Sequence, residues 1–210
     1  MKTTPFLLLV CVLLVISACA PQRVTPDIPA SAVKIGLAPY SQPLGTSDLL
    51  AGYIQENIPR IDSHVLNLLD EAFENMLRTS TEREYISGAA VQAALLRKTK
   101  TATVSAFAYW MEIGQTINAD ILLVPQIMHW QERQGGELGI ERPAAVTTDM
   151  FLLDIKNRRL IGRSLYEEQQ RALTENLLDL GKFIERCGKW VTAGQLALEG
   201  MQKAIKEFGL

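Results

Sequence analysis

Apolar and polar residues alternate along most of the chain with the periods of strands and helices. Residues 33–39, VKIGLAP, alternate as a strand does, and Pro39 ends the run. A shorter helix is expected near residues 48–57. A long helix follows, because apolar residues recur at helical spacing after a capping residue, Asp62 or Ser63. Its predicted core stripe comprises Ile61, Val65, Leu68, Leu69, Ala72, Phe73, Met76 and Leu77.

The middle of the chain predicts two more helices and a buried strand. A short strand is expected at residues 83–86, with helices at 87–96 and 103–117. The apolar run ILLVPQIMHW, residues 121–130, is predicted to be a strand because it is short and contains Pro125, which would disrupt a helix. Since proline has no N–H to donate, we expect a sheet edge or a bulge at that residue.

A hairpin and a closing helix complete the pattern. Residues 133–143 are polar and glycine-rich, as in a loop, and two strands, 144–155 and 159–170, follow as a hairpin. The last helix is predicted to begin at Thr192, whose spacing to Gln195 matches a capping box. Its core side is predicted to hold Leu198, Met201, Ile205 and Phe208.

This order of elements predicts the fold class. Two early strands are separated by helices, three strands then follow one another, and a helix ends the chain. We therefore expect an α/β (α+β) sandwich in which helices pack on a mixed sheet of about five strands.

The first eighteen residues have the layout of a secretory signal. Lys2 precedes an almost unbroken apolar run from Phe6 to Ala18, shorter than the about 20 residues that a membrane-spanning helix needs. Ile16-Ser17-Ala18-Cys19 resembles the bacterial lipobox. This resemblance implies that the Cys19 sulfur receives a diacylglyceryl group, that the signal is cut before it, and that the new amino terminus is acylated. The alternative is a soluble secreted protein with Cys19 near its cleavage site.

The residues after Cys19 bear on location. By the same resemblance, an aspartate there would favour the inner membrane, so Ala20 favours the outer membrane, with the protein facing the periplasm. Residues 20–34 are rich in proline and offer little that could pack, which is typical of an extended tether. We divide the chain into a signal peptide, 1–18, a lipidated cysteine with a flexible tether, 19–34, and a single periplasmic domain, 35–210.

Charge and cysteine content exclude some functions. The formal net charge of −2 becomes −3 once Lys2 leaves with the signal, which argues against a nucleic-acid partner. Cys11 also leaves with the signal and Cys19 carries lipid, so Cys187 has no partner within the mature chain. We expect a fold without an internal disulfide and an inert, at least half-buried Cys187. An intermolecular disulfide and a catalytic thiol are the alternatives.

Sequence motifs for catalysis, metal binding and cofactor binding are missing. His64 and His129 do not have the close spacing of zinc ligands, and no phosphate or dinucleotide loop occurs, so we expect neither a metal nor a cofactor. Glu167 and Glu168 would point to opposite faces of a strand and could not share a site. We therefore predict that the chain is not an enzyme. A hydrolase with dispersed carboxylates stays open, and its candidates are Asp120, Asp149 and Asp154.

Residues 165–190 combine the residue types of binding hot spots with weak periodicity. The candidate partner-binding residues are Tyr166, Gln169, Phe183, Arg186 and Trp190. The alternative is a covering loop that closes the core, and one segment can do both.

Residues 119–127, ADILLVPQI, and residues 150–164 resemble the patterns ADYxLxGxI and VxLxLVDxxTGxxxxS of a group of periplasmic domains. The group includes the amino-terminal domain of the translocation protein TolB, outer-membrane lipoprotein activators of penicillin-binding proteins, and the curli secretion channel lipoprotein. Pro125 replaces the usual glycine, and Asn157-Arg158 replace the Thr-Gly turn. No long alternating segment for a membrane-spanning hairpin is evident, so a curli-type pore is not expected.

The sequence thus favours a lipid-anchored, non-catalytic lipoprotein that binds another envelope protein or takes part in an envelope assembly. A homo-oligomer is a variant of this prediction. A ligand- or peptidoglycan-binding module is the first alternative, and the hydrolase is the second.

Overall fold

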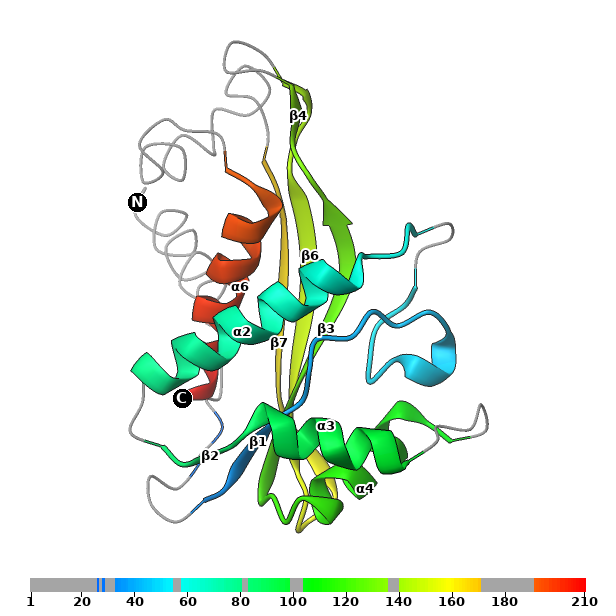
Figure 1. Cartoon of the computed structure of the whole chain (residues 1–210), viewed down its shortest axis with the longest axis vertical. Helices are drawn as coiled ribbons and strands as arrows, with labels where there is room; N and C mark the ends of the chain where they lie inside the picture. The colour runs from blue at the N-terminus through cyan, green and yellow to red at the C-terminus, as the bar shows by residue number, and fades with distance from the viewer. Residues whose placement is uncertain are drawn as a thin grey trace, which may run out of the picture.

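The computed structural model describes residues 26, 28, 33–54, 58–80, 83–98, 104–135, 140–170 and 191–210. These residues build a five-stranded sheet in the order β2-β1-β3-β6-β7 (Figure 1). The strands are β1 (Ile35–Leu37), β2 (Tyr85–Ile86), β3 (Ile121–Gln131), β6 (Ala145–Asp154) and β7 (Arg159–Gln169). β1 runs parallel to both of its neighbours, whereas β3, β6 and β7 are antiparallel. The predicted mixed sheet and α/β sandwich are therefore confirmed.

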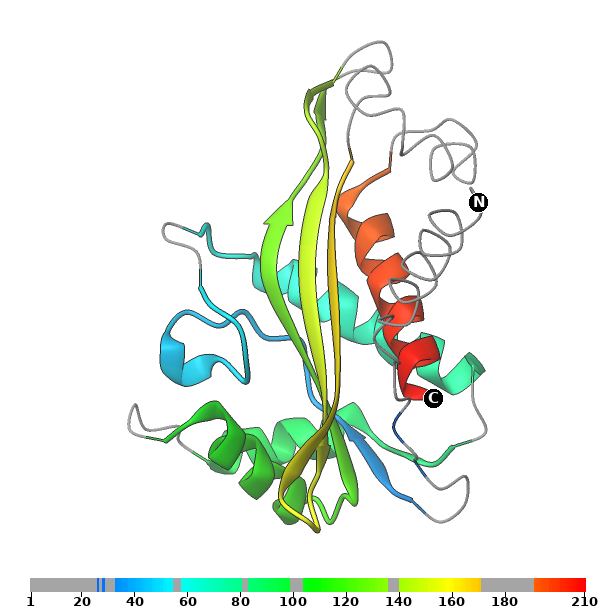
Figure 2. The same cartoon turned by 180° about the vertical axis from the view of Figure 1, so that it is seen from behind.

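Helices cover both faces of this sheet. They are α2 (Ser63–Ser80), α3 (Gly88–Arg97), α4 (Ala106–Thr116) and α6 (Ala193–Phe208). α2 and α6 pack on one face, over Met150 and Leu152, and α3 and α4 pack on the other, over Phe151 and Leu153. α2 crosses in front of the long strands in Figure 1 and behind them in Figure 2, which also shows α6 beside β7. In the described part of the chain, no helix is long and apolar enough to cross a membrane.

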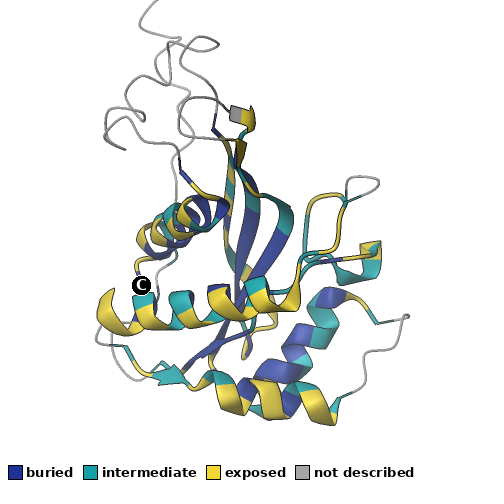
Figure 3. Cartoon of the chain, turned by 45° about the horizontal axis from the view of Figure 1, so that its top comes forward, coloured by how far each residue is buried: buried dark blue, intermediate teal, exposed yellow. Residues whose placement is uncertain are grey.

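The long central strands are buried on both faces, which explains their nearly continuous apolar sequence (Figure 3). Along β6, Met150 and Leu152 alternate with Phe151 and Leu153, and all four side chains are fully buried. Each side chain of this size contributes about 1.5–3 kcal/mol when it is removed from water. β6 thus supplies apolar surface to the hydrophobic core on each face of the sheet.

The amphipathic helices are largely as predicted. Along α2, the buried side chains Leu69, Phe73 and Leu77 are four residues apart, whereas Leu68 is 51% exposed and was wrongly assigned to the core. Thr192 caps α6 in a capping box with Gln195, as expected. The list of buried residues in α6 includes Met201, Ile205 and Phe208 but not Leu198, which is 36% exposed.

The helix predicted near residues 48–57 is wrong. In the described part of this stretch, a 3-10 turn, η1 (Thr46–Asp48), forms and residues 49–54 are not helical. The side chain of Gln126 binds backbone groups that a helix would pair internally. Its Nε2 donates to the Asp48 carbonyl at 2.7 Å, and its Oε1 accepts from the Leu50 N–H at 3.3 Å. Gly52 then has φ +90°, a conformation that favours glycine.

Pro125 does not lie at a sheet edge, because β3 is the central strand. β1 ends at Leu37, so Pro125 faces the chain just beyond β1, and its carbonyl accepts from the Ser41 N–H at 3.3 Å. The register shift in β3 comes later, between Ile127 and His129. The predicted edge is thus wrong, and the bulge is displaced along the strand.

Part of the stretch predicted as a polar loop, residues 133–143, forms two short strands instead. β4 (Gln134–Gly135) and β5 (Ile140–Arg142) pair antiparallel there and extend β3 and β6.

Several predictions fall on residues outside the described ranges. These are the lipobox with Cys19, most of the tether, Phe183, Arg186, Cys187 and Trp190. The division of the chain into signal, tether and one domain also stays a prediction.

Candidate functional site

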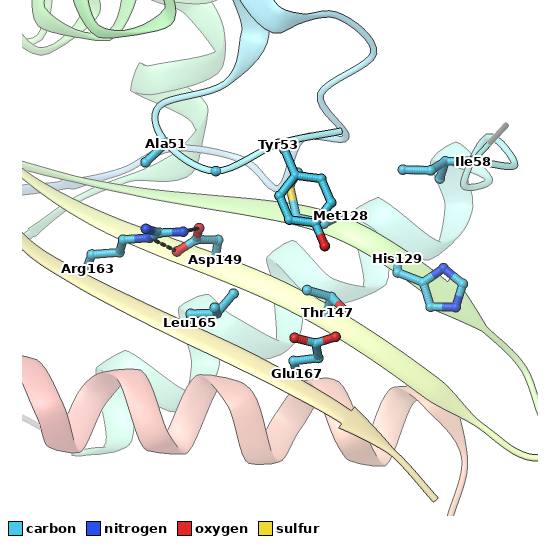
Figure 4. A pocket seen from close by; sticks show the side chains of 11 residues that line it. Ala51, Tyr53, Ile58, Met128, His129, Thr147, Asp149, Arg163, Leu165 and Glu167 are labelled. Carbon is cyan, nitrogen blue, oxygen red and sulfur yellow. Dashed lines mark hydrogen bonds and ion pairs between the residues drawn. The ribbon is translucent and has the colours of Figure 1, made fainter. Parts of the chain in front are cut away.

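Part of one sheet face is open, because α3 and α4 cover only one end of it. Farther along the strands, residues 51–53 and Ile58 lie over this face and leave a pocket of about 80 Å³ (Figure 4). We call it the open-face pocket. Its other walls come from β3, β6 and β7 and include Met128, His129, Thr147, Asp149, Arg163, Leu165 and Glu167.

The period of two along β7 decides which side chains reach this pocket. Arg163, Leu165 and Glu167 line it. The residues between them face α6: the Ser164 hydroxyl donates to Glu207 at 2.6 Å, and the Tyr166 hydroxyl donates to Glu199 at 2.8 Å. One strand therefore anchors α6 with one set of side chains and presents the other set to the pocket.

A buried ion pair forms the floor of the pocket. Asp149 is 2% exposed and accepts from Arg163 Nε at 3.0 Å and from Nη2 at 2.7 Å. Burial raises the pKa of Asp149, and the hydrogen bonds and charge of Arg163 offset only part of this effect. The Arg163 side chain is 39% exposed, and its guanidinium carbon lies 5.7 Å from the Phe151 ring centroid. Arg163 thus neutralises a buried charge and still reaches the surface.

The pocket combines apolar, cationic and acidic groups at a solvent boundary. Tyr53 is 74% exposed and Leu165 is 43% exposed, although both are large. Arg163 and Glu167 add opposite charges. Tyrosine and arginine are the residue types that dominate binding hot spots. A volume of about 80 Å³ is far below the roughly 300–1,000 Å³ of small-molecule sites, and it suits one side chain of a bound partner.

The geometry does not gather the dispersed carboxylates into one site. The Asp120 carboxylate accepts from the Lys34 N–H at 2.9 Å, and Asp154 binds Asn157 and Arg159 at the hairpin turn. Burial raises the pKa of Asp154, but the hydrogen bonds from Asn157 and Arg159 outweigh it and hold the pKa below its ordinary value. Asp149 lies five residues from Asp154 along β6, about 17 Å in an extended strand.

The two histidines lie in different places. His64 is exposed on α2, and His129 lines the open-face pocket. Within the described ranges, no group of three or more histidine, cysteine, aspartate or glutamate side chains is arranged to hold a metal ion.

Two of the candidate partner-binding residues are described, and they lie on opposite faces of β7. Tyr166 is half-buried against α6, whereas Gln169 is exposed at the end of the strand. Sequence reasoning missed the pocket residues Tyr53 and Met128 and the pairing of Asp149 with Arg163. The hairpin pattern held no signal for that pair, because the register next to the turn at residues 155–158 would set Asp149 opposite Ser164. Only the register shift between Leu152 and Leu153 moves Asp149 opposite Leu165 and so diagonal to Arg163.

Solved structures of low sequence identity match part of this backbone. The PelC dodecamer from Paraburkholderia phytofirmans matches with a TM-score of 0.49 and 12% identity, covering 88% of this chain and 94% of that chain. The LpoB C-terminal domain from Salmonella enterica matches with a TM-score of 0.40 and 11% identity, covering 70% and 88%. A lipoprotein from Neisseria meningitidis matches with a TM-score of 0.40 and 13% identity, covering 76% and 94%. Neither a protein-family model nor a curated protein matches the sequence. Backbone likeness at this level does not transfer a function.

Proposed function

We propose that this chain is an envelope lipoprotein that carries lipid on Cys19 and acts by binding another envelope protein, without catalysis. The lipobox at residues 16–19 is the observation that carries the proposal, since it follows a signal-like apolar run and precedes a proline-rich tether. Several acyl chains hold a protein on a membrane far more firmly than one chain does. The absence of aspartate after Cys19 favours the periplasmic face of the outer membrane.

The open-face pocket is the surface that we assign to the partner. Tyr53, Leu165 and Arg163 present apolar area and a cation at a hollow that fits one inserted side chain. Among the described residues that line it, no hydrogen bond joins His129 to the Thr147 hydroxyl, so a hydroxyl nucleophile with its base is not assembled there. These features support contact with a protein rather than chemistry.

The polar lining of the pocket favours a second candidate, a module that binds a ligand or a peptidoglycan fragment. Arg163, Glu167 and Thr147 could hydrogen-bond a polar group of such a ligand. Saturable binding to purified wall fragments, lost in Tyr53→Ala, would favour this candidate over a protein partner.

The anchor is tested by Cys19→Ser. We expect uncleaved precursor and no incorporation of labelled fatty acid, because serine lacks the nucleophilic thiolate that the transfer requires. Cys187→Ser is the matched control and should be labelled normally. Normal labelling of Cys19→Ser, or recovery of the unaltered mature chain without added mass, would contradict the anchor.

The partner surface is tested with a photo-crosslinking phenylalanine analogue at position 53 in intact cells. We expect one reproducible adduct with an envelope protein, identified by mass spectrometry. The same analogue at position 96 is the control, because Leu96 is 88% exposed but lies on α3, outside the open-face pocket. Equal adducts at both positions would reject the open-face pocket as the partner site.

A further inference from the structure

β7 ends the sheet, and its outer side carries backbone groups that point away from the protein. The Gln170 N–H donates to the Ala144 carbonyl at 2.9 Å, so the even-numbered residues of this strand direct their backbone groups toward β6. The Leu165 carbonyl, in contrast, accepts from the side-chain ammonium of Lys203 on α6. The backbone groups of Arg163, Leu165, Glu167 and Gln169 therefore face outward.

Within the described ranges, these outward groups form a long open edge. β7 has eleven residues, whereas the strand at the other edge, β2, has two. Among the described residues, the backbone N–H groups of Leu165, Glu167 and Gln169 have no hydrogen-bond partner. Such an edge is a template for another strand, and proteins usually shield it with charges or bulges. In the described part of the chain, Lys203 covers one carbonyl of this edge, Arg163 and Glu167 place charges along it, and a bulge at Ile161 interrupts it at one end.

We infer that β7 pairs antiparallel with β7 of a second copy of this chain, with Leu165 opposite Leu165 of the second copy. A two-fold axis then passes between the two leucines, and the two sheets become continuous. Outward-facing residues meet outward-facing residues in this register, as an antiparallel ladder requires. The inference does not depend on the lipid anchor or on the partner assigned to the open-face pocket.

Charge complementarity selects this register and this occupant. With Leu165 at the axis, Arg163 lies opposite Glu167 of the second copy, and Glu167 lies opposite Arg163 of the second copy. Moving the axis to position 163 or 167 would set two arginines or two glutamates against each other. An axis at position 164 or 166 would leave Arg163 and Glu167 without an opposite charge on the facing strand of the second copy. The edge is therefore complementary to itself.

We call the two paired β7 edges, residues 163–167 of each copy, the seam. The side chains along it suit such a pairing. Leu165 is 43% exposed, so it has apolar surface to bury against its copy. Glu167 is exposed, and Arg163 reaches the surface beyond its contacts with Asp149. The ladder can extend to Gly162 at one end, because the register shift between Leu152 and Leu153 leaves Ile161 unpaired as a bulge. The outward-facing residues then form three pairs, which are Arg163 with Glu167, Leu165 with Leu165, and Glu167 with Arg163. These pairs give about six backbone hydrogen bonds between the two copies.

Lys203 is expected to weaken the association between the two copies. Its ammonium occupies the Leu165 carbonyl, which would accept from the N–H of Leu165 of the second copy in the ladder. Pairing must displace this lysine, so the dimer is expected to be reversible rather than permanent.

Cysteine crosslinking of the full chain in native membranes tests the register. We use a Cys187→Ser background and place cysteine at Leu165→Cys, where the two Cα atoms would lie about 5.5 Å apart, within disulfide range. Gln169→Cys is the control on the same edge, because its two copies would lie about 27 Å apart in this register. We expect an oxidant to give a disulfide dimer of Leu165→Cys at least tenfold more abundant than that of Gln169→Cys. Equal yields, or no dimer in either variant, would overturn the inference.

A charge reversal provides an independent test on the same membranes. Glu167→Lys places a lysine opposite Arg163 of the second copy at both ends of the seam, and it should lower the Leu165→Cys dimer yield about tenfold. Glu141→Lys makes the same change on β5, away from the seam, and should leave the yield unchanged. Circular dichroism of each variant checks that the fold is intact. An unchanged yield in a folded Glu167→Lys variant would reject the pairing.

Discussion

Arg163 shows how one side chain can serve the core and the surface together. Its guanidinium satisfies the carboxylate of Asp149, which is 2% exposed and could not stay ionised alone at low energetic cost. The same group lines the open-face pocket and lies over Phe151. Any substitution of Arg163 will therefore change stability as well as binding, and tests of binding are better placed at Tyr53.

Arg163→Met should lower the free energy of unfolding by about 3 kcal/mol at pH 7, because it leaves a buried carboxylate without its counter-charge. Losing the arginine raises the pKa of Asp149 further than burial already does. The carboxyl group then protonates as the pH falls, so the loss should be smaller at pH 5. Urea unfolding at both pH values measures this. The double variant Asp149→Asn/Arg163→Met should lose less free energy of unfolding than Arg163→Met does, and its loss should not depend on pH. An equal loss in the single variant at both pH values would contradict the assignment.

At the scale of single elements, local signals in the sequence fix the helix ends and the hairpin. Thr192 accepts from the Gln195 N–H at 3.1 Å, and the Gln195 side chain accepts from the Thr192 N–H at 2.9 Å. At the other end of α6, Gly209 has the left-handed conformation that often follows a helix. By contrast, the irregular segment 49–54 depends on Gln126, 76 residues farther along the chain, and no local pattern predicts that contact.

Thr192→Ala should lower the free energy of unfolding by about 1 kcal/mol, because the first turn of α6 loses its side-chain acceptor. Thermal unfolding followed by circular dichroism measures the change. Thr79→Ala is the comparison, since Thr79 bonds carbonyls of its own helix near the end of α2 and caps no N–H. A larger loss in Thr79→Ala than in Thr192→Ala would show that the capping box contributes little.

For the whole molecule, stability should depend on pH because the fold leaves carboxyl groups with shifted pKa values. Burial raises the pKa of Asp70 to about 6; the hydrogen bond from the Tyr40 N–H opposes this shift and the charge of Glu74 adds to it. A carboxyl group whose pKa is higher in the folded state stabilises the fold below its unfolded pKa, near 3.8, and that contribution is lost as the pH rises through 6. The raised pKa of Asp149 likewise stabilises the fold at low pH, whereas the lowered pKa of Asp154 stabilises the fold at higher pH.

We therefore expect the free energy of unfolding to fall between pH 4 and pH 7, with about 1–2 kcal/mol from Asp70, because solvent screening at its exposed side reduces the effect of the full pKa shift. Asp70→Asn should remove most of this slope, since the asparagine oxygen can still accept from Tyr40 but does not ionise. Chemical denaturation at several pH values measures the slope. A slope that is the same in Asp70→Asn and in the unaltered chain would contradict the shifted pKa.

The sequence by itself determined most of the order of elements, the mixed sheet, the hairpin and the capped last helix, although it predicted a helix at residues 48–57 that does not form and missed β4 and β5. Each of these follows from short-range periodicity and turn chemistry, as the alternation of Met150 with Phe151 and the spacing of Leu69, Phe73 and Leu77 illustrate. It also supplied the resemblance of residues 16–19 to a lipobox, on which the proposed anchor rests, because such a motif is linear. Only the tertiary structure decided that Pro125 lies in a central strand, that residues 51–53 and Ile58 lie over an open sheet face, and that no other strand of the described residues pairs with the outer edge of β7. These features depend on contacts between residues far apart in the chain, and the periodicity of one segment carries no information about which distant segment packs against it.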